Sequence, residues 1–217
     1  MTRRRQVVVI GLGRFGTAVA TSLTAIGHEV LAIDIDHRAV TEIADQVTHA
    51  VQADATDEDT LKQLGVQDFD AAFVGVSSNV ERSILATMLL KQMGIPLVIA
   101  KAQTTIHGDV LAKVGADRIV FPEREVGDQL AHSFTVKNAV DYMPLGPEYG
   151  ISKLTPPSGF AGRTVGELAL PNRLKVALLA IERNHQVVVN PGAEERILPS
   201  DMLVVVGTDD DVERLGT

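Results

Sequence analysis

The chain has 217 residues, 45% of them hydrophobic, which is enough for one full α/β domain and a smaller second one. Acidic residues outnumber basic ones by 28 to 20, giving a net charge of −8, and the only dense basic run is residues 3–5, so we expect no nucleic-acid partner. Cysteine is absent, which excludes disulfides, thiolate catalysis and cysteine-based zinc sites and fits a reducing compartment.

The apolar runs are too short for membrane spans. None approaches the roughly 20 residues needed to cross a bilayer. The first run, QVVVI, follows three arginines but breaks at once into GLGRFG, which is unlike a secretory signal. We therefore expect a soluble, cytoplasmic chain whose contact with a membrane comes through another subunit.

Short apolar runs alternate with helical patterns up to about residue 140. The runs predicted as strands are QVVVI, EVLAIDID, HAVQAD, AAFVGVS, LVIAKAQ and RIVFP. Apolar strands that alternate with helices indicate a parallel sheet covered on both faces. The predicted fold class is therefore α/β, with a Rossmann-like doubly wound sheet.

Local signals place several helix boundaries. Gly27 and Gly94 stand where helices should end, and Thr56 with Asp59 resembles a capping box at a helix start. Residues 123 to about 142 predict one longer helix, and the following run, MPLGPEYG, has the prolines and glycines of a linker.

Beyond this linker the pattern changes to clustered strands, ISKLTPP, KVALLAIERN, QVVVNP and MLVVVGTD, with short helices near VGELAL and DDVERL. This pattern predicts a small α+β domain that needs a partner surface. The predicted domains are residues 1–142, a linker at 143–150, and residues 151–217.

A glycine motif links the first strand to the first helix. Gly11, Gly13 and Gly16 form G-x-G-x-x-G: the first allows a tight turn, the second a close approach of phosphate, and the third close packing of helix on strand. The N-terminus of the helix adds unpaired N–H donors for an anion. Arg14 lies beside these donors, where it would hold a terminal phosphate or extend into solvent.

Acidic residues follow the next strands. Asp34 ends the second strand about 20 residues after the motif, where a carboxylate binds ribose hydroxyls and disfavours NADP. Asp36 would either join it or cap the helix that starts at His37. Asp54 and Ser77 end the third and fourth strands, so each would contact adenosine or cap a helix.

Residues for catalysis are not grouped in any recognisable pattern. The histidines are scattered, with no metal-binding or Ser–His–acid arrangement, although His107 follows the fifth strand and could approach the ligand edge. The second domain is also too small and apolar to be a substrate domain. We expect a binding protein and not an enzyme.

Several motifs have a specific order and spacing along nearly the whole chain: VIGLGRFG, LAIDID, VQADATDEDTLKQLG, VIAKAQ, LAKVGADRIVFPERE and LVVVG. Together they resemble the regulator-of-conductance-of-potassium (RCK) proteins, specifically the single-unit cytoplasmic subunits of Ktr-type potassium uptake systems. Double-length Trk-type relatives carry two such units.

The resemblance implies an assembly and a ligand. The N-terminal lobes would pair, homodimers would form a homo-octameric ring, and the ring would dock on a membrane-embedded potassium-translocating subunit. ATP and ADP would compete for the Rossmann site, with ATP favouring the active arrangement. Arg14 would read the γ-phosphate across the dimer, and Glu123 would join a divalent cation, Mg²⁺ or Ca²⁺, near it.

The predicted nucleotide site, including its neighbours in the matching motifs, consists of Gly11, Gly13, Arg14, Phe15, Gly16, Asp34, Asp36, Asp54, Ala55, Ser77 and Lys101, and the predicted metal ligand is Glu123. In some members of this family the C-terminal lobe binds cyclic di-AMP. Here the turn LPNRLK lacks the glycine and the extra residues expected of such a site, and Asn172 and Arg173 remain candidates for it.

Other functions remain open from the residues alone. The glycine motif and Asp34 suit NAD(H) as well as ATP or ADP, so a Trk-type NAD(H) sensor is the first alternative. A small NAD-dependent oxidoreductase is the second. A redox-responsive repressor would need a DNA-binding helix pair or a basic face, and the sequence has no recognisable form of either.

Overall fold

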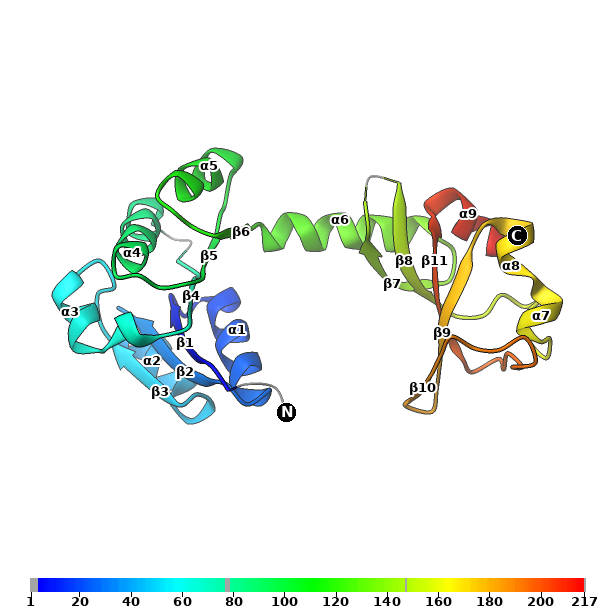
Figure 1. The fold of residues 1–217 in the computed structure, drawn as a ribbon, viewed down its shortest axis with the longest axis horizontal. Helices are drawn as coiled ribbons and strands as arrows, with labels where there is room; N and C mark the ends of the chain where they lie inside the picture. Colours follow the sequence, from blue (N-terminus) through cyan, green and yellow to red (C-terminus); the bar gives the residue numbers. More distant parts are fainter. Residues whose placement is uncertain (1–3, 77–78, 147, 217) are drawn as a thin grey trace. The chain divides into compact units, whose positions relative to one another are not determined.

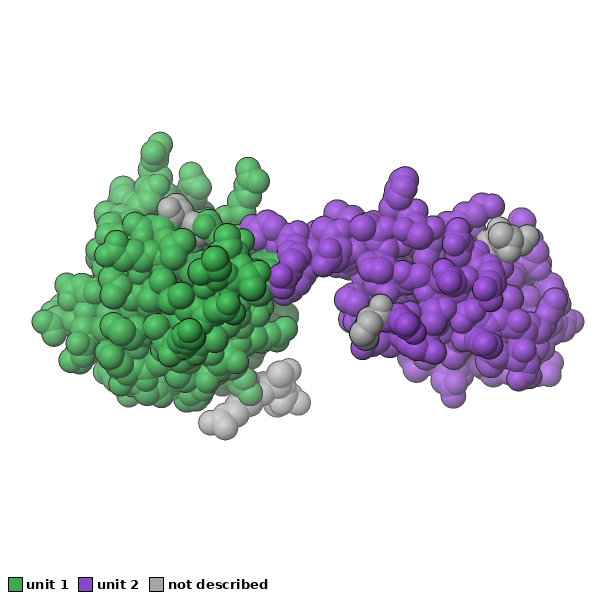
Figure 2. All heavy atoms as spheres, turned by 90° about the horizontal axis from the view of Figure 1, so that it is seen from above, with its two compact units in different colours: residues 1–122 green, residues 123–217 purple. Residues whose placement is uncertain are grey.

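The chain divides into two compact units, coloured separately in Figure 2. The computed structural model describes residues 4–76, 79–146 and 148–216. The first unit ends at Pro122 and the second begins at Glu123. Each unit has its own sheet and its own hydrophobic core.

The first unit is built on a six-stranded parallel sheet (Figure 1). The strand order β3-β2-β1-β4-β5-β6 is that of a doubly wound Rossmann fold, so the predicted fold class is confirmed. The strands are β1 (Gln6–Ile10), β2 (Glu29–Asp34), β3 (His49–Gln52), β4 (Ala71–Val74), β5 (Val98–Lys101) and β6 (Arg118–Val120).

Helices cover both faces of this sheet. Residues of α1 (Arg14–Ala25) and α2 (His37–Ile43) pack in one hydrophobic cluster, and residues of α3 (Glu58–Gln63), α4 (Val80–Gln92) and α5 (Thr105–Lys113) pack in another. Short 3₁₀ turns lie at Ala44–Gln46 and Val66–Asp68.

Strand β1 shows why the sheet needs a layer of helices on each face. Val7 and Val9 belong to the cluster with α1 and α2, whereas Val8 and Ile10 belong to the cluster with α3 and α4. Successive side chains of a strand point to opposite faces, so an unbroken apolar run must be covered on both sides.

The helix boundaries agree with some of the local signals and correct another. Gly27 and Gly94 follow the ends of α1 and α4 with φ of 93° and 85°, which glycine adopts without strain. The predicted capping box at Thr56 is wrong: Asp57 is the N-cap of α3, and the Thr56 hydroxyl instead donates to Asp54. Both residue types can cap a helix, with Asp somewhat preferred, and the path of the loop places Asp57 and not Thr56 at the start of α3.

The second unit holds a five-stranded antiparallel sheet with the order β10-β9-β11-β8-β7. Its strands are β7 (Ala139–Pro144), β8 (Tyr149–Leu154), β9 (Ala177–Arg183), β10 (Gln186–Val189) and β11 (Met202–Thr208). The helices are α6 (Pro122–Thr135), α7 (Val165–Leu168), α8 (Leu170–Leu174) and α9 (Asp209–Glu213), followed by a 3₁₀ turn at Arg214–Gly216.

The long helix predicted for residues 123 to about 142 is shorter in the structure. It ends at Thr135, Asn138 turns the chain with φ of 66°, and residues 139–144 form β7, which pairs with β8. The described residues of the predicted linker, 143–146 and 148–150, therefore belong to the second unit, with 143–144 in β7 and 149–150 in β8, and the units divide near residue 122. The apolar residues of this segment are spaced as in a helix up to about residue 142. Hydrogen bonds between β7 and β8 nevertheless hold residues 139–144 in an extended conformation.

The second unit contains an ionic cluster around Arg183. Asp201, whose side chain is fully buried, accepts two hydrogen bonds from the Arg183 guanidinium at 2.7 and 2.8 Å and one from the Leu198 backbone at 2.8 Å. Arg183 also pairs with Glu195 at 3.0 Å. A buried carboxylate is tolerated only when it is paired and hydrogen-bonded, and this one is.

In the described part of the chain, no helix is both long and apolar enough to cross a membrane.

Candidate functional site

The glycine motif forms a tight turn between β1 and α1. Gly11 has φ of 88°, and its N–H donates to the Ile33 carbonyl at 2.9 Å. At Gly16 an added Cβ would lie 1.8 Å from the Gly11 carbonyl oxygen, so helix and turn touch through backbone alone. These two glycines have the conformational and packing roles predicted for them.

A further glycine completes this packing, and the sequence pattern did not single it out. Gly75 follows β4, and a Cβ there would lie 3.0 Å from the Gly11 carbonyl oxygen and 3.3 Å from Gly16 Cα. Its N–H donates to the Ile10 carbonyl at 2.7 Å. The glycine turn therefore needs a small residue at position 75, directly after β4. This requirement follows from the strand order, which places β4 beside β1.

Gly13 plays a different part, as the N-cap of α1. It has no side chain to accept from the first N–H groups of the helix, and a Cβ there would meet no heavy atom within 4 Å. The N-terminus of α1 is thus approachable, with its donors and the positive end of its dipole directed to the same place. That is the geometry that binds phosphate in doubly wound folds.

Asp34 ties the turn to the end of β2. Its two carboxylate oxygens accept from the Leu12 backbone at 2.5 Å and the Asp36 backbone at 2.8 Å. The side chain of Asp36 accepts from the Arg38 N–H at 2.9 Å and is the N-cap of α2. Of the two interpretations of Asp36, the structure therefore shows the cap.

A pocket of about 230 Å³ lies at the carboxyl edge of the sheet. Five of the predicted residues line it: Gly11, Gly13, Asp34, Asp54 and Ala55. Apolar side chains contribute most of the rest of its wall, namely Ile10, Ile33, Ile35, Ala53, Val76 and Ala86. A slot with apolar walls and a few polar groups is typical of a nucleotide site.

The remaining predicted residues are placed differently. Arg14, at the first position of α1, is exposed and does not line the pocket. Gly16 is buried against the turn and Phe15 is half-buried, and neither lines the pocket. Lys101 is almost fully buried at the end of β5, with Nζ 5.7 Å from the centre of the Phe15 ring. This cation–π contact helps to hold the first turn of α1 against β5. Ser77 lies outside the described residues.

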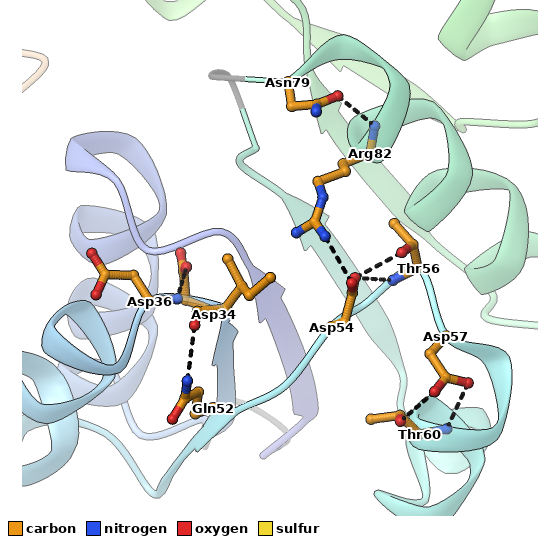
Figure 3. Close-up of polar contacts among 10 residues, drawn as sticks. Asp34, Asp36, Gln52, Asp54, Thr56, Asp57, Thr60, Asn79 and Arg82 are labelled. Atoms are coloured by element: carbon orange, nitrogen blue, oxygen red, sulfur yellow. Dashed lines mark hydrogen bonds and ion pairs between the residues drawn. The ribbon is translucent and has the colours of Figure 1, made fainter.

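The pocket also contains an ion pair that sequence reasoning missed (Figure 3). Arg82, in the first turn of α4, donates from Nη2 to Asp54 Oδ2 at 2.8 Å. Thr56 donates to Asp54 Oδ1 from its backbone at 3.0 Å and from its hydroxyl at 2.7 Å. The available signal was the position of Arg82, since the helix after each strand of such a sheet begins at the ligand edge.

These contacts favour the charged form of Asp54. Hydrogen bonds from the Thr56 hydroxyl and backbone, together with the charge of Arg82, hold the pKa of Asp54 below its ordinary value despite some burial. Asp54 is therefore a carboxylate acceptor, and the helix-capping role considered for it from the sequence is not observed, because Asp57 caps α3.

Glu123 lies in the second unit, as the second residue of α6, and is exposed. Among the described residues no three histidine or acidic side chains group closely enough to hold a metal ion. An exposed carboxylate suits a hard cation such as Mg²⁺, but a single one does not make a coordination shell.

A second pocket, of about 460 Å³, lies in the second unit. Arg163, Arg173 and Arg214 line it together with apolar side chains, whereas Asn172 does not. At the turn that lacks the expected glycine, Lys175 adopts φ of 56°, the left-handed conformation for which glycine is usual.

The fold and the first pocket define a Rossmann-type nucleotide-binding protein with a small antiparallel second domain. The TrkA-N domain matches residues 7–122 and the TrkA-C domain matches residues 151–216. The chain belongs to the TrkA-N/TrkA-C family of RCK-domain regulatory subunits, which confirms the resemblance predicted from its motifs.

Relatives match over nearly their full length. The chain is 39% identical to the Ktr system potassium uptake protein C of Bacillus subtilis (strain 168), over 97% of this chain and 96% of that protein. It is 37% identical to Ktr system potassium uptake protein A of the same organism, over 98% and 96%. Identity to Ktr system potassium uptake protein A of Vibrio alginolyticus is 35%, over 96% and 95%.

A solved structure supports the fold. The GsuK RCK domain superposes with a TM-score of 0.68 at 17% sequence identity, covering 99% of this chain and 47% of that one. At this identity the likeness concerns the fold alone.

Proposed function

We propose that this protein is the cytoplasmic regulatory subunit of a potassium uptake system and that it binds ATP and ADP at the first pocket. The pocket itself is the main support: it brings the open N-terminus of α1, Asp34 and Asp54 together in one apolar slot. Full-length similarity to Ktr system potassium uptake proteins supplies the biological setting.

The pocket supports binding more than chemistry. Its described lining includes no histidine, lysine or cysteine, and the carboxylates of Asp34 and Asp54 are already engaged in hydrogen bonds. An acid or base catalyst needs a group free to exchange a proton with substrate. We therefore propose that the nucleotide is sensed and not consumed.

Discrimination between ATP and ADP requires a contact with the additional phosphate. Arg14 is the exposed cation nearest in sequence to the open helix end, and Glu123 offers an oxygen ligand for Mg²⁺ or Ca²⁺. A bound cation would supply charge neutralisation beside the phosphates. In this proposal the two groups act across a pair of chains, and the difference in contacts shifts the ring between two shapes.

An apolar stripe supports assembly with further copies. Val126, Leu130 and Phe134 follow each other at four-residue spacing on α6, and their exposed fractions are 52%, 63% and 91%. Such a stripe on a helix is expected to be covered by protein. We propose that homodimers assemble into an octameric ring that contacts a membrane-embedded potassium-translocating subunit.

The proposal can be tested by identifying the nucleotide that copurifies with the native protein by mass spectrometry, followed by calorimetric titration with ATP, ADP and NADH. We expect ATP and ADP to bind and to compete. Tighter binding of NADH than of either would favour the alternative of an NAD(H) sensor. Hydride transfer from NADH to a carbonyl substrate would contradict a purely regulatory role.

The role of Arg14 has its own test. Arg14→Ala should remove the preference for ATP over ADP while leaving adenosine binding unchanged. Arg38→Ala is a matched control, because Arg38 is an exposed arginine in the first turn of the neighbouring helix α2 and does not line the pocket. Unchanged discrimination in Arg14→Ala would refute this role.

A further inference from the structure

The ion pair between Arg82 and Asp54 lies at one end of the first pocket and joins two elements that are far apart in sequence. Arg82 belongs to α4, whose N-cap is Asn79, and Asp54 belongs to the loop between β3 and α3 (Figure 3). The side chains are 35% and 37% exposed, so the pair faces the pocket without being sealed from it.

The hydrogen bonds leave Asp54 with one acceptor position. A carboxylate has about four lone-pair sites, two on each oxygen. Thr56 fills both sites of Oδ1 with its backbone and hydroxyl donors, and Arg82 fills one site of Oδ2. The site that remains on Oδ2 can accept one further N–H or O–H donor.

The position of this acceptor follows from the order of groups along a nucleotide. The phosphates belong at Gly13 and the N-terminus of α1, and the ribose belongs at Asp34, as in other doubly wound folds. Asp54, Thr56 and Arg82 are the polar side chains of the described lining that remain, and Ile35, Val76 and Ala86 supply apolar surface beside them. A planar base fits such a slot.

We propose that Arg82 is a positioning residue that orients Asp54 to accept from the 6-amino group of a purine, so that the pocket selects adenine. This inference rests on the proposed nucleotide function. Hypoxanthine and guanine carry a carbonyl oxygen at that position, which would face the carboxylate without a hydrogen between them. Once the base covers Oδ2 from water, an acceptor left unpaired in this way is costly, and sites that pair a substrate group by hydrogen bonding discriminate strongly.

The experiment compares ADP with inosine diphosphate, which has the same ribose and phosphates but a 6-oxo group. Calorimetric titrations of the full-length protein should show tighter binding of ADP by roughly tenfold or more. Arg82→Ala should reduce this ratio to within about threefold, because Asp54 loses the donor that fixes Oδ2. Arg82→Lys, which keeps a donor, should restore part of the ratio.

Two controls locate the effect at the base. Adenosine, which has no phosphate, should lose affinity in Arg82→Ala by the same factor as ADP. Arg38→Ala should leave the ADP to inosine diphosphate ratio unchanged, since Arg38 does not line the pocket. Thermal unfolding of each variant shows whether it is folded. If Arg82→Ala is not folded, the ADP to inosine diphosphate ratio of Arg82→Lys, which should be intermediate, tests the inference in its place.

The outcomes separate this inference from the function on which it rests. If the ratio is large and persists in Arg82→Ala, or if both nucleotides weaken equally, Arg82 does not set base selectivity and the inference is overturned, while nucleotide sensing stands. If the unmodified protein binds ADP and inosine diphosphate equally, the inference is also overturned. If it binds no adenine nucleotide, the proposed function fails as well.

Discussion

Two glycines of the same turn, Gly13 and Gly16, should respond in opposite ways to substitution by alanine. At Gly16 the new Cβ would lie 1.8 Å from the Gly11 carbonyl oxygen, whereas ordinary contact begins at 3.4 Å. The start of α1 would have to move by about 1.6 Å relative to the turn, and both partners are backbone. Overpacking of this severity costs about 3 kcal/mol or more.

At Gly13 the same change should be almost neutral for folding. The backbone there has φ of −70°, which alanine adopts without strain, and no heavy atom lies within 4 Å of the new Cβ. The loss of a favourable N-cap glycine and the reduced freedom of the unfolded chain nearly offset each other, so we expect a change within about 1 kcal/mol. The methyl group does, however, stand where a phosphate should approach.

Urea unfolding and calorimetric titration with ADP measure the two effects. Gly16→Ala should lower the free energy of unfolding of the first unit by about 3 kcal/mol or more, and Gly13→Ala should keep that stability but weaken ADP binding roughly tenfold or more. The reasoning is refuted if Gly16→Ala is as stable as the unmodified protein, or if Gly13→Ala binds ADP with full affinity.

The other predictions concern the second unit. Asp201→Ala should destabilise it by about 3 kcal/mol in urea unfolding, because Arg183 loses its bidentate partner, although it keeps Glu195; a loss below about 1 kcal/mol would contradict this. Hydrogen bonds from Arg183 and the Leu198 backbone lower the pKa of Asp201 in the folded state. Its contribution to stability should therefore be complete above about pH 4 and be lost as the pH falls through the folded-state pKa, a dependence that Asp201→Ala should lack. Gly150→Ala should disrupt the hairpin of β7 and β8, since its Cβ would lie 2.3 Å from the ring of Tyr142; an unchanged melting temperature would show that the ring can move aside.

Much of the first unit could be predicted because its signals are local. The apolar run of β1, the glycines after helices and the spacing from the glycine motif to Asp34 each depend on a short window of chain, and the structure has β1 at the predicted residues. Unbroken apolar strands also imply layers on both faces, which is how the doubly wound class could be derived.

Other features depend on which segments meet in space. Residues 139–142, predicted as the end of a helix, form part of strand β7, because β8 offers them a hydrogen-bonding edge. Asp57 and not Thr56 caps α3, because the Thr56 hydroxyl turns to Asp54. Local preference differs by less than about 1 kcal/mol between such alternatives, so tertiary contacts decide.

In the candidate site, too, some features follow from local sequence and others from contacts between distant segments. The sequence alone determined the glycine turn and the acid at the end of β2, because conformation and spacing within one βαβ unit require them. Only the tertiary structure brought Arg82 to Asp54 and Gly75 to the turn, because these contacts depend on the strand order that places β4 and α4 beside β1. Arg82 and Asp54 are 28 residues apart in sequence, so no short window of the chain contains both partners.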